Sequence, residues 1–146
     1  MADFHQGNLT TFHRHMPIAL VLPVTPTEVG SKALDGILSE LKEVPYLNEI
    51  IIPVGRTSRK DDFLRARETF SVLPQPHYVF WASGPRVARF LEQLEARDLS
   101  AGGDGKGRSA WLAYGFILAR EQSKVIALHD CDIVNYSPEL LARLVY

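Results

Sequence analysis

The chain has 146 residues, of which 46% are hydrophobic and 23% charged, and its formal net charge is −1 at pH 7. This length suits a single domain with a sizeable core, and the small net charge predicts no general attraction to nucleic acid or to membrane surfaces. No apolar run approaches the roughly 20 residues needed to span a bilayer, and the N-terminus lacks a signal-peptide pattern. We therefore expect a cytoplasmic protein whose partners include neither nucleic acid nor a membrane.

The N-terminal part of the chain predicts a tail, a strand and a helix. Residues 1–16 are polar without a period and are expected to form a flexible tail, so that the folded domain spans 17–146. The apolar run 18–23 predicts a buried strand. In the helix expected next, Thr25 would be the N-cap and Glu28 would close a capping box.

Further strands alternate with helices along the rest of the chain. The β-branched run 49–54 and the aromatic run 77–81 each predict a strand, and a helix is expected after each of them. The second of these helices, at 86–97, carries an apolar stripe. The helix after it carries Trp111 and Leu118 among apolar residues that fit burial beside the last strand. The alternation predicts a layered α/β/α domain with a mostly parallel sheet.

A glycine-rich segment, 102–108, opens the last of these helices. Its backbone can approach a ligand closely at Gly105, and the helix N–H groups together with Lys106 and Arg108 favour an anion. The spacing fits neither a Walker A loop, since Gly107 rather than Ser or Thr follows Lys106, nor a dinucleotide-binding fingerprint. A purely structural loop remains the alternative.

Two acidic residues end the last predicted strand. The run 125–133 begins with four apolar residues, which suit a strand buried on both faces, and it contains Asp130 and Asp132. On an extended backbone both carboxylates project to one side, whereas Cys131 points to the other and is expected to be a buried, unreactive thiol. Beyond the carboxyl end of a parallel strand, such a pair can hold a hard divalent cation that bridges to a diphosphate. Two solvated acids at a turn are the structural alternative.

The glycine-rich loop and the acid pair are expected to meet in space. The loop opens one helix and the acids end the very next strand, so both belong at the same edge of the sheet. A cationic loop that faces two carboxylates suits a metal-bound diphosphate.

At these residues the sequence resembles the GT-A glycosyltransferases, and within them the glucosyl-3-phosphoglycerate and mannosyl-3-phosphoglycerate synthases. The similarity extends from about Pro17 to the last residue. The segments that carry it are Leu22-Pro23, Glu28, Leu41-Lys42-Glu43-Val44, Gly105-Lys106-Gly107-Arg108, Trp111-Leu112-Ala113-Tyr114-Gly115, Ala127-Leu128-His129-Asp130-Cys131-Asp132-Ile133 and Leu140-Leu141-Ala142-Arg143-Leu144-Val145-Tyr146. The resemblance implies a Rossmann-like half-domain of a nucleotide-diphospho-sugar transferase.

The resemblance also implies a reaction and a set of site residues. The reaction would be a retaining transfer of glucose or mannose from a UDP- or GDP-hexose to 3-phosphoglycerate or a related acceptor, with Mg²⁺ or Mn²⁺ as cofactor. The residues that would bind the nucleotide sugar are Pro23, Glu28, Gly105, Lys106 and Asp130. The cation would be held by Asp132 with help from Asp130. Where related sequences often place an aspartate after the second strand to read the base, this chain has Gly55-Arg56.

The chain departs from the family in length. In the family the acceptor pocket lies beyond the segment that matches this chain, so we expect a donor-binding half with little or no turnover alone. The final helix would leave apolar surface uncovered, and a second copy could cover it in a homodimer. A non-catalytic, self-associating module is therefore the alternative function. A nucleotidylyltransferase fits less well, because Pro23-Val24-Thr25-Pro26 stands where its glycine-rich basic loop would follow the first strand.

Overall fold

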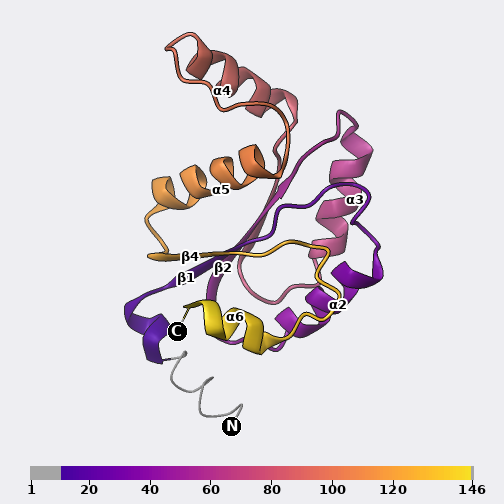
Figure 1. The fold of residues 1–146 in the computed structure, drawn as a ribbon, viewed down its shortest axis with the longest axis vertical. Helices are drawn as coiled ribbons and strands as arrows, with labels where there is room; N and C mark the ends of the chain where they lie inside the picture. The colour runs from indigo at the N-terminus through magenta and orange to yellow at the C-terminus, as the bar shows by residue number, and fades with distance from the viewer. Residues whose placement is uncertain (1–10, 146) are drawn as a thin grey trace.

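Four parallel strands form the centre of the fold, which the computed structural model describes for residues 11–145 (Figure 1). The strands are β1 (Ile18–Val21), β2 (Leu47–Val54), β3 (His77–Trp81) and β4 (Val125–Leu128), and they lie side by side in the order β3-β2-β1-β4. The helices are α2 (Lys32–Leu41), α3 (Lys60–Phe70), α4 (Pro85–Glu95), α5 (Lys106–Arg120) and α6 (Pro138–Val145). An all-parallel sheet with helices against both faces confirms the predicted fold class.

Most of the predicted N-terminal tail lies outside the described residues. These omit 1–10 and 146, and residues 11–15 are helical. None of the helices within 11–145 is long and apolar enough to cross a membrane.

Apolar residues on the two faces of the sheet build two separate cores. In β1, Ile18 and Leu20 belong to the core shared with α2, α3 and α6, whereas Ala19 and Val21 belong to the core shared with α5. Figure 1 shows α5 on one side of the sheet and α2 and α6 on the other. Because side chains alternate between faces and both faces are covered, a buried parallel strand has a continuous apolar sequence.

The helix after β1 starts later than its sequence predicts. Residues 26–30 form turns, and Gly30 has a φ of 80°, which a right-handed helix does not accommodate. Ser31 is the N-cap instead, since its side chain accepts a hydrogen bond of 3.2 Å from the backbone N of Leu34. The prediction that Thr25 caps this helix is therefore wrong.

Two helices leave apolar residues exposed that the sequence predicts to be covered. Helix α4 stands away from it (Figure 1), and none of its residues is buried; Phe90 is 46% exposed. Helix α5 packs through Ala113 and Ile117, whereas Trp111 and Leu118 are 48% and 69% exposed, contrary to the expectation that both are buried.

The order of the strands indicates where a ligand would bind. From β1 the chain proceeds outward through β2 to β3, and then it returns to the other side of β1 to form β4. The direction of the crossovers thus reverses between β1 and β4. In open parallel sheets, ligands bind outside the carboxyl ends of the strands at such a point. The segments that follow β1 and β4 are therefore where a site is expected.

Candidate functional site

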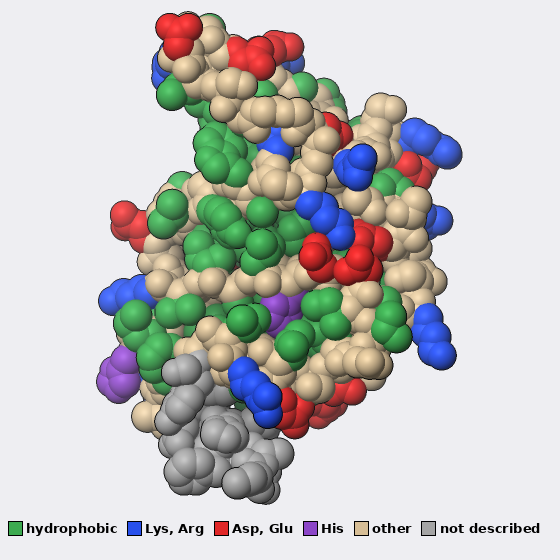
Figure 2. All heavy atoms as spheres, viewed as in Figure 1, with side chains coloured by type: hydrophobic (Ala, Val, Ile, Leu, Met, Phe, Trp, Pro, Cys, Tyr) green, Lys and Arg blue, Asp and Glu red, His purple; other side chains and the backbone are tan. Residues whose placement is uncertain are grey.

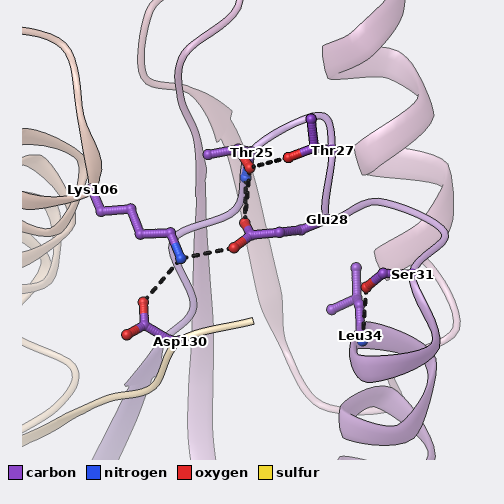
Figure 3. A network of polar contacts seen from close by, with 7 residues as sticks. All are labelled: Thr25, Thr27, Glu28, Ser31, Leu34, Lys106 and Asp130. Atoms are coloured by element: carbon purple, nitrogen blue, oxygen red, sulfur yellow. Dashed lines mark hydrogen bonds and ion pairs between the residues drawn. The ribbon is translucent and has the colours of Figure 1, made fainter. Parts of the chain in front are cut away.

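The ammonium group of Lys106 lies between two carboxylates (Figure 3). Its Nζ is 2.7 Å from Oε1 of Glu28 and 3.1 Å from Oδ1 of Asp130. Glu28 lies in the turns that follow β1, Asp130 follows β4, and Lys106 is the first residue of α5. Three segments that are distant in the sequence therefore meet at the carboxyl ends of β1 and β4. This contact confirms the expectation that the glycine-rich loop and the acid pair come together.

Glu28 is held in place by the turn to which it belongs. Its Oε2 accepts hydrogen bonds from the backbone N of Thr25 at 2.8 Å and from the Thr25 hydroxyl at 3.1 Å. The capping-box contact expected of Glu28 is thus present, although the turn does not continue as a helix. Because the side chain is only 14% exposed and already fixed through Oε2, its Oε1 reaches Lys106 with little further loss of side-chain freedom.

Lys106 provides a stable positive charge at this position. Partial burial alone would lower the pKa of its ammonium group, but the hydrogen bonds to Glu28 and Asp130 and their negative charges raise that pKa above its ordinary value. Lys106 therefore stays protonated throughout the neutral range. Because α5 begins at this residue, the positive end of the helix dipole adds to the same field.

The backbone around Lys106 is open to an approaching ligand. Gly105 is the N-cap of α5, and Gly107 follows Lys106 in the first turn. Apart from the two adjacent residues and the local helix backbone, no atom of the described residues lies within 4 Å of the position that a Cβ would take at Gly105 or Gly107. The loop can therefore bring its N–H groups close to an anion.

Asp130 and Asp132 lie in an irregular turn rather than in a strand. Strand β4 ends at Leu128, as the four apolar residues predict, but the backbone that follows forms a turn, so the expected extended backbone through Asp130 and Asp132 is wrong. Both acids are nevertheless exposed, and Cys131 between them is fully buried. The buried Cys131 side chain anchors the turn between these two exposed acids.

Cys131 lies within electrostatic range of four charged side chains. Burial raises the pKa of the Cys131 thiol, and the charges of Glu28, Lys106, Asp130 and Asp132 act on it in addition. Lys106 and Asp130 both remain accessible, with side chains 35% and 60% exposed. The cluster is therefore open to a ligand from outside.

The turn that carries Asp130 and Asp132 is supported by a buried pair of side chains, His129 and Tyr136. No pattern in the sequence predicts this pair. Nδ1 of His129 lies 3.1 Å from the hydroxyl of Tyr136, and the two rings meet edge to face. The backbone N of His129 also donates to the carbonyl of Val21 at 3.1 Å. Burial lowers the pKa of His129, although the charge of Asp130 opposes this shift. The backbone of His129 therefore holds this segment against β1, and its imidazole joins the segment to Tyr136.

The acid pair suits a divalent cation that prefers oxygen ligands. Within residues 11–145, no group of three or more His, Cys, Asp or Glu side chains is placed to hold a metal ion, whereas a zinc site takes three or four protein ligands. Two exposed carboxylates suit Mg²⁺ or Mn²⁺, which bind oxygen and, for Mg²⁺ in particular, take further ligands from water and substrate phosphates. Asp130 and Asp132 are the residues that could hold such an ion together with a diphosphate.

A second hollow adjoins the glycine-rich loop at the ends of β2 and β3. It has a volume of about 360 Å³, and the residues that line it are Arg56, Thr57, Ser58, Ser83, Asp104 and Arg108. Oδ1 of Asp104 lies 3.4 Å from the backbone N of Arg56, which donates to it, and 3.2 Å from Nη2 of Arg108. The sequence offers one signal for this pocket, because the resemblance implies an aspartate at the place where this chain has Arg56.

Two known proteins are similar to this chain over its whole length. It is 38% identical to the glucosyl-3-phosphoglycerate synthase of Persephonella marina, over 100% of this chain and 41% of that protein. It is 30% identical to the glucosyl-3-phosphoglycerate synthase of Methanococcoides burtonii, over 99% of this chain and 39% of that protein. The chain matches the glucosyl-3-phosphoglycerate synthase group. It spans about two fifths of the length of the curated relatives it matches, and no protein-family model matches it.

The residues that the resemblance assigns to the site lie in segments at one rim of the sheet. The six that would bind the donor or the cation are Pro23, Glu28, Gly105, Lys106, Asp130 and Asp132. Glu28, Lys106 and Asp130 contact one another directly. Pro23 is buried just after β1, and Asp132 is exposed in the same turn as Asp130. Their contacts with a nucleotide sugar and a metal ion stay predictions.

Proposed function

We propose that this chain binds the nucleotide-diphosphate sugar of a glycosyltransferase. The observation that carries the proposal is the position of Lys106, between Glu28 and Asp130 at the point where the strand order reverses. The match to two glucosyl-3-phosphoglycerate synthases supports this class of reaction. The parent reaction is then the retaining transfer of glucose or mannose from a UDP- or GDP-hexose to 3-phosphoglycerate or a related acceptor.

Lys106 binds the diphosphate of the donor in this proposal. An ammonium group has three N–H donors, and those of Lys106 reach Glu28 at 2.7 Å and Asp130 at 3.1 Å. The remaining donor can turn to a phosphate oxygen while Glu28 keeps its position. Because the charge of Lys106 and the N-terminus of α5 are fixed before the donor arrives, they stabilise the departing nucleoside diphosphate without reorganisation.

Asp130 and Asp132 hold Mg²⁺ or Mn²⁺ in the same proposal. Such a cation, when bound, supplies further positive charge to the diphosphate. Glu28, Asp130 and Asp132 carry three negative charges against the single positive charge of Lys106, so one divalent cation makes the cluster neutral. The acid pair on its own would repel an anionic donor, and donor binding is therefore expected to require the cation.

This chain is expected to bind the donor without transferring the sugar. The residues at the rim account for the diphosphate and the cation, and none of them is assigned to the acceptor. The chain spans about two fifths of the length of its relatives, and we assign acceptor binding to parts of those relatives that the chain does not match.

Isothermal titration calorimetry with UDP-glucose, GDP-glucose and GDP-mannose, with and without MgCl₂, tests the proposal. We expect binding that requires the metal and that Asp132→Ala abolishes. Asp61→Ala is the matched control, because it removes an exposed carboxylate from the first turn of α3. Metal-independent binding that Asp132→Ala leaves unchanged would contradict the proposed donor site.

The open edge of β4 favours self-association as a second function. Within the described residues, β4 pairs with β1 on one side only, and Figure 2 shows hydrophobic side chains gathered on the face over α5 and β4. The exposed apolar residues include Leu118, Leu128, Val134 and Leu144. A strand edge beside apolar surface favours pairing with a second copy. In sedimentation velocity at several concentrations, a tight dimer without nucleotide affinity supports this function, and a monomer at all concentrations contradicts it.

A further inference from the structure

The pocket of about 360 Å³ has a rigid floor. The hydroxyl of Ser83 donates to the carbonyl of Thr57 at 2.6 Å and accepts from the backbone N of Thr57 at 3.1 Å. Nε1 of Trp81 donates to the same carbonyl at 2.9 Å, and the hydroxyl of Thr57 donates to Asp62 at 2.7 Å. These groups use most of their hydrogen-bonding capacity on one another. They therefore shape the pocket but contribute little to choosing its ligand.

The walls of the pocket carry the polar groups that remain available. Arg56 is exposed with a φ of 56°, a backbone conformation that residues other than glycine rarely adopt. Its backbone N is held by Oδ1 of Asp104, and Arg108 pairs with that same oxygen. In the described part of the chain, the guanidinium of Arg56 and Oδ2 of Asp104 make no hydrogen bond or ion pair. The walls thus offer one planar donor group and one carboxylate acceptor.

We infer that this pocket binds the nucleobase of the donor and prefers guanine. The inference rests on the proposed function, since it places the diphosphate at Lys106, two residues from both Asp104 and Arg108. A guanidinium only donates hydrogen bonds, so it needs a base edge that presents acceptors. Guanine presents O6 and N7 side by side and binds arginine in a bidentate manner, whereas adenine and cytosine place an amino donor at the corresponding position.

Asp104 also favours guanine, through the N–H groups that lie on the side of O6 away from N7. The N–H groups of guanine next to O6 can donate to the carboxylate of Asp104 while Arg56 binds O6 and N7. Uracil has a C–H group where guanine has N7, and it has one N–H group next to O4 where guanine has N1–H and the 2-amino group, so it makes fewer of these hydrogen bonds. The expected order of affinity is therefore guanine, then uracil, then adenine and cytosine.

A nucleobase fits the pocket better than a second phosphate does. Arg108 is already neutralised by Asp104, so the walls carry the net positive charge of Arg56 alone. An anion would also meet the carboxylate of Asp104, whereas the N–H groups of a base use it. The volume lies within the range of about 300–1,000 Å³ typical of small-molecule sites.

Calorimetry with GDP, UDP, ADP and CDP in the presence of MgCl₂ tests the inference. We expect GDP to bind about tenfold more tightly than ADP or CDP, which corresponds to one good bidentate contact. Arg56→Ala should weaken GDP binding by about the same factor and leave ADP binding almost unchanged. Arg56→Lys, which keeps the charge but loses the planar fork, should have nearly the same effect. Arg59→Ala is the matched control, since Arg59 is exposed nearby and does not line the pocket.

The outcomes separate this inference from the proposed function. Equal affinities for the four nucleotides, or a preference for GDP that Arg56→Ala leaves intact, overturn the inference while the donor site stands. Inorganic phosphate that competes with GDP in the wild type but not in Arg56→Ala shows an anion site and also overturns it. If none of the four nucleotides binds, the proposed function fails and the inference fails with it.

Discussion

The ammonium nitrogen of Lys106 lies 2.7 Å from Oε1 of Glu28, although 78 residues separate the two in the sequence. This ion pair joins the start of α5 to the turns after β1, and so it fixes the two sides of the proposed donor crevice relative to each other. The same ammonium is the proposed contact for the diphosphate. Substitutions at Lys106 should therefore change both the stability of the fold and the affinity for a nucleotide.

Lys106→Met tests these two roles together. It leaves Glu28 and Asp130 facing each other without a counter-charge, and because the pair is partly exposed we expect the free energy of unfolding to fall by about 1 kcal/mol. The affinity for a metal-bound nucleoside diphosphate should fall by at least about tenfold, as for the loss of a charged hydrogen bond. Urea denaturation and calorimetry measure the two effects. Lys106→Arg, which keeps the charge, should lose less of both, and unchanged nucleotide affinity in Lys106→Met would place the diphosphate elsewhere.

The stabilising effect of Lys106 should hold through neutral and mildly alkaline pH. The pKa of this ammonium is raised in the folded protein above its ordinary value of 10.5, so the folded state binds the proton more tightly than the unfolded chain does. The resulting stability is complete below the ordinary pKa and is lost only as the pH rises through the raised pKa. The difference in unfolding free energy between wild type and Lys106→Met should accordingly be constant from pH 7 to about 10. A difference that disappears within this range would contradict the charged pairing.

Gly55 should not tolerate a side chain. A Cβ at this position would lie 2.6 Å from the hydroxyl oxygen of the buried Ser109, so either this hydroxyl must turn away or the end of β2 and the first turn of α5 must separate. We expect Gly55→Ala to lower the free energy of unfolding by about 1–3 kcal/mol, as overpacking does. Ser109→Ala removes the obstructing oxygen, and the double variant should recover most of the loss. Thermal denaturation of the four proteins measures this coupling, and additive effects would show that the two positions do not meet.

The strands of this fold could be predicted because each is a short apolar run without a competing pattern. The predicted strand 77–81 coincides with β3, and 49–54 lies within β2. The start of α2 could not be predicted in the same way, because both Thr25 and Ser31 are suitable N-caps and only the positive φ of Gly30 decides between them. A sequence pattern also shows that α4 has an apolar face without showing whether anything covers it.

The candidate site likewise has one part that could be predicted from the sequence and one part that could not. The meeting of Lys106 with Asp130 followed from strand order, because consecutive segments at the carboxyl ends of parallel strands are neighbours. The pocket beside it depends on the left-handed conformation of Arg56 and on the contact of its backbone with Asp104. No periodicity or motif spacing encodes such a loop conformation, so it became visible only in three dimensions.

Cys131 should react slowly with thiol reagents in the native protein. Its side chain is fully buried, and burial raises the pKa of the thiol, so little reactive thiolate is present near neutral pH. It is the one cysteine of the chain, and the rate of labelling therefore reports the opening of the turn that carries Asp130 and Asp132. Addition of GDP with MgCl₂ should slow labelling further, because a bound ligand stabilises the closed turn. Fast labelling at the rate of a free thiol would show that the turn is not anchored by this residue.

Arg120 and Glu49 form an ion pair at the opposite edge of the sheet, far from the proposed donor site. Glu49 is only 2% exposed, and its carboxylate lies 3.4 Å from Nε of Arg120 and accepts a 2.7 Å hydrogen bond from Ser123. The guanidinium of Arg120 also lies over the ring of Tyr78, 4.3 Å from its centroid, and donates to the Tyr78 hydroxyl at 2.8 Å. The end of α5 is thus held against both β2 and β3.

Arg120→Ala should lower the free energy of unfolding by about 2–3 kcal/mol, because it leaves a buried carboxylate without its counter-charge and removes the contact with Tyr78. Arg120→Ala combined with Glu49→Gln should cost less than the sum of the two single changes, since the second change removes the unpaired charge. Nucleotide affinity should be the same in all of these variants under conditions where they are folded, because Lys106 and the acid pair lie at the carboxyl ends of the strands. A loss of nucleotide affinity that parallels the loss of stability would mean that the two ends of α5 are coupled. Stabilisation at Arg120 and nucleotide binding at Lys106 would then not be separate roles.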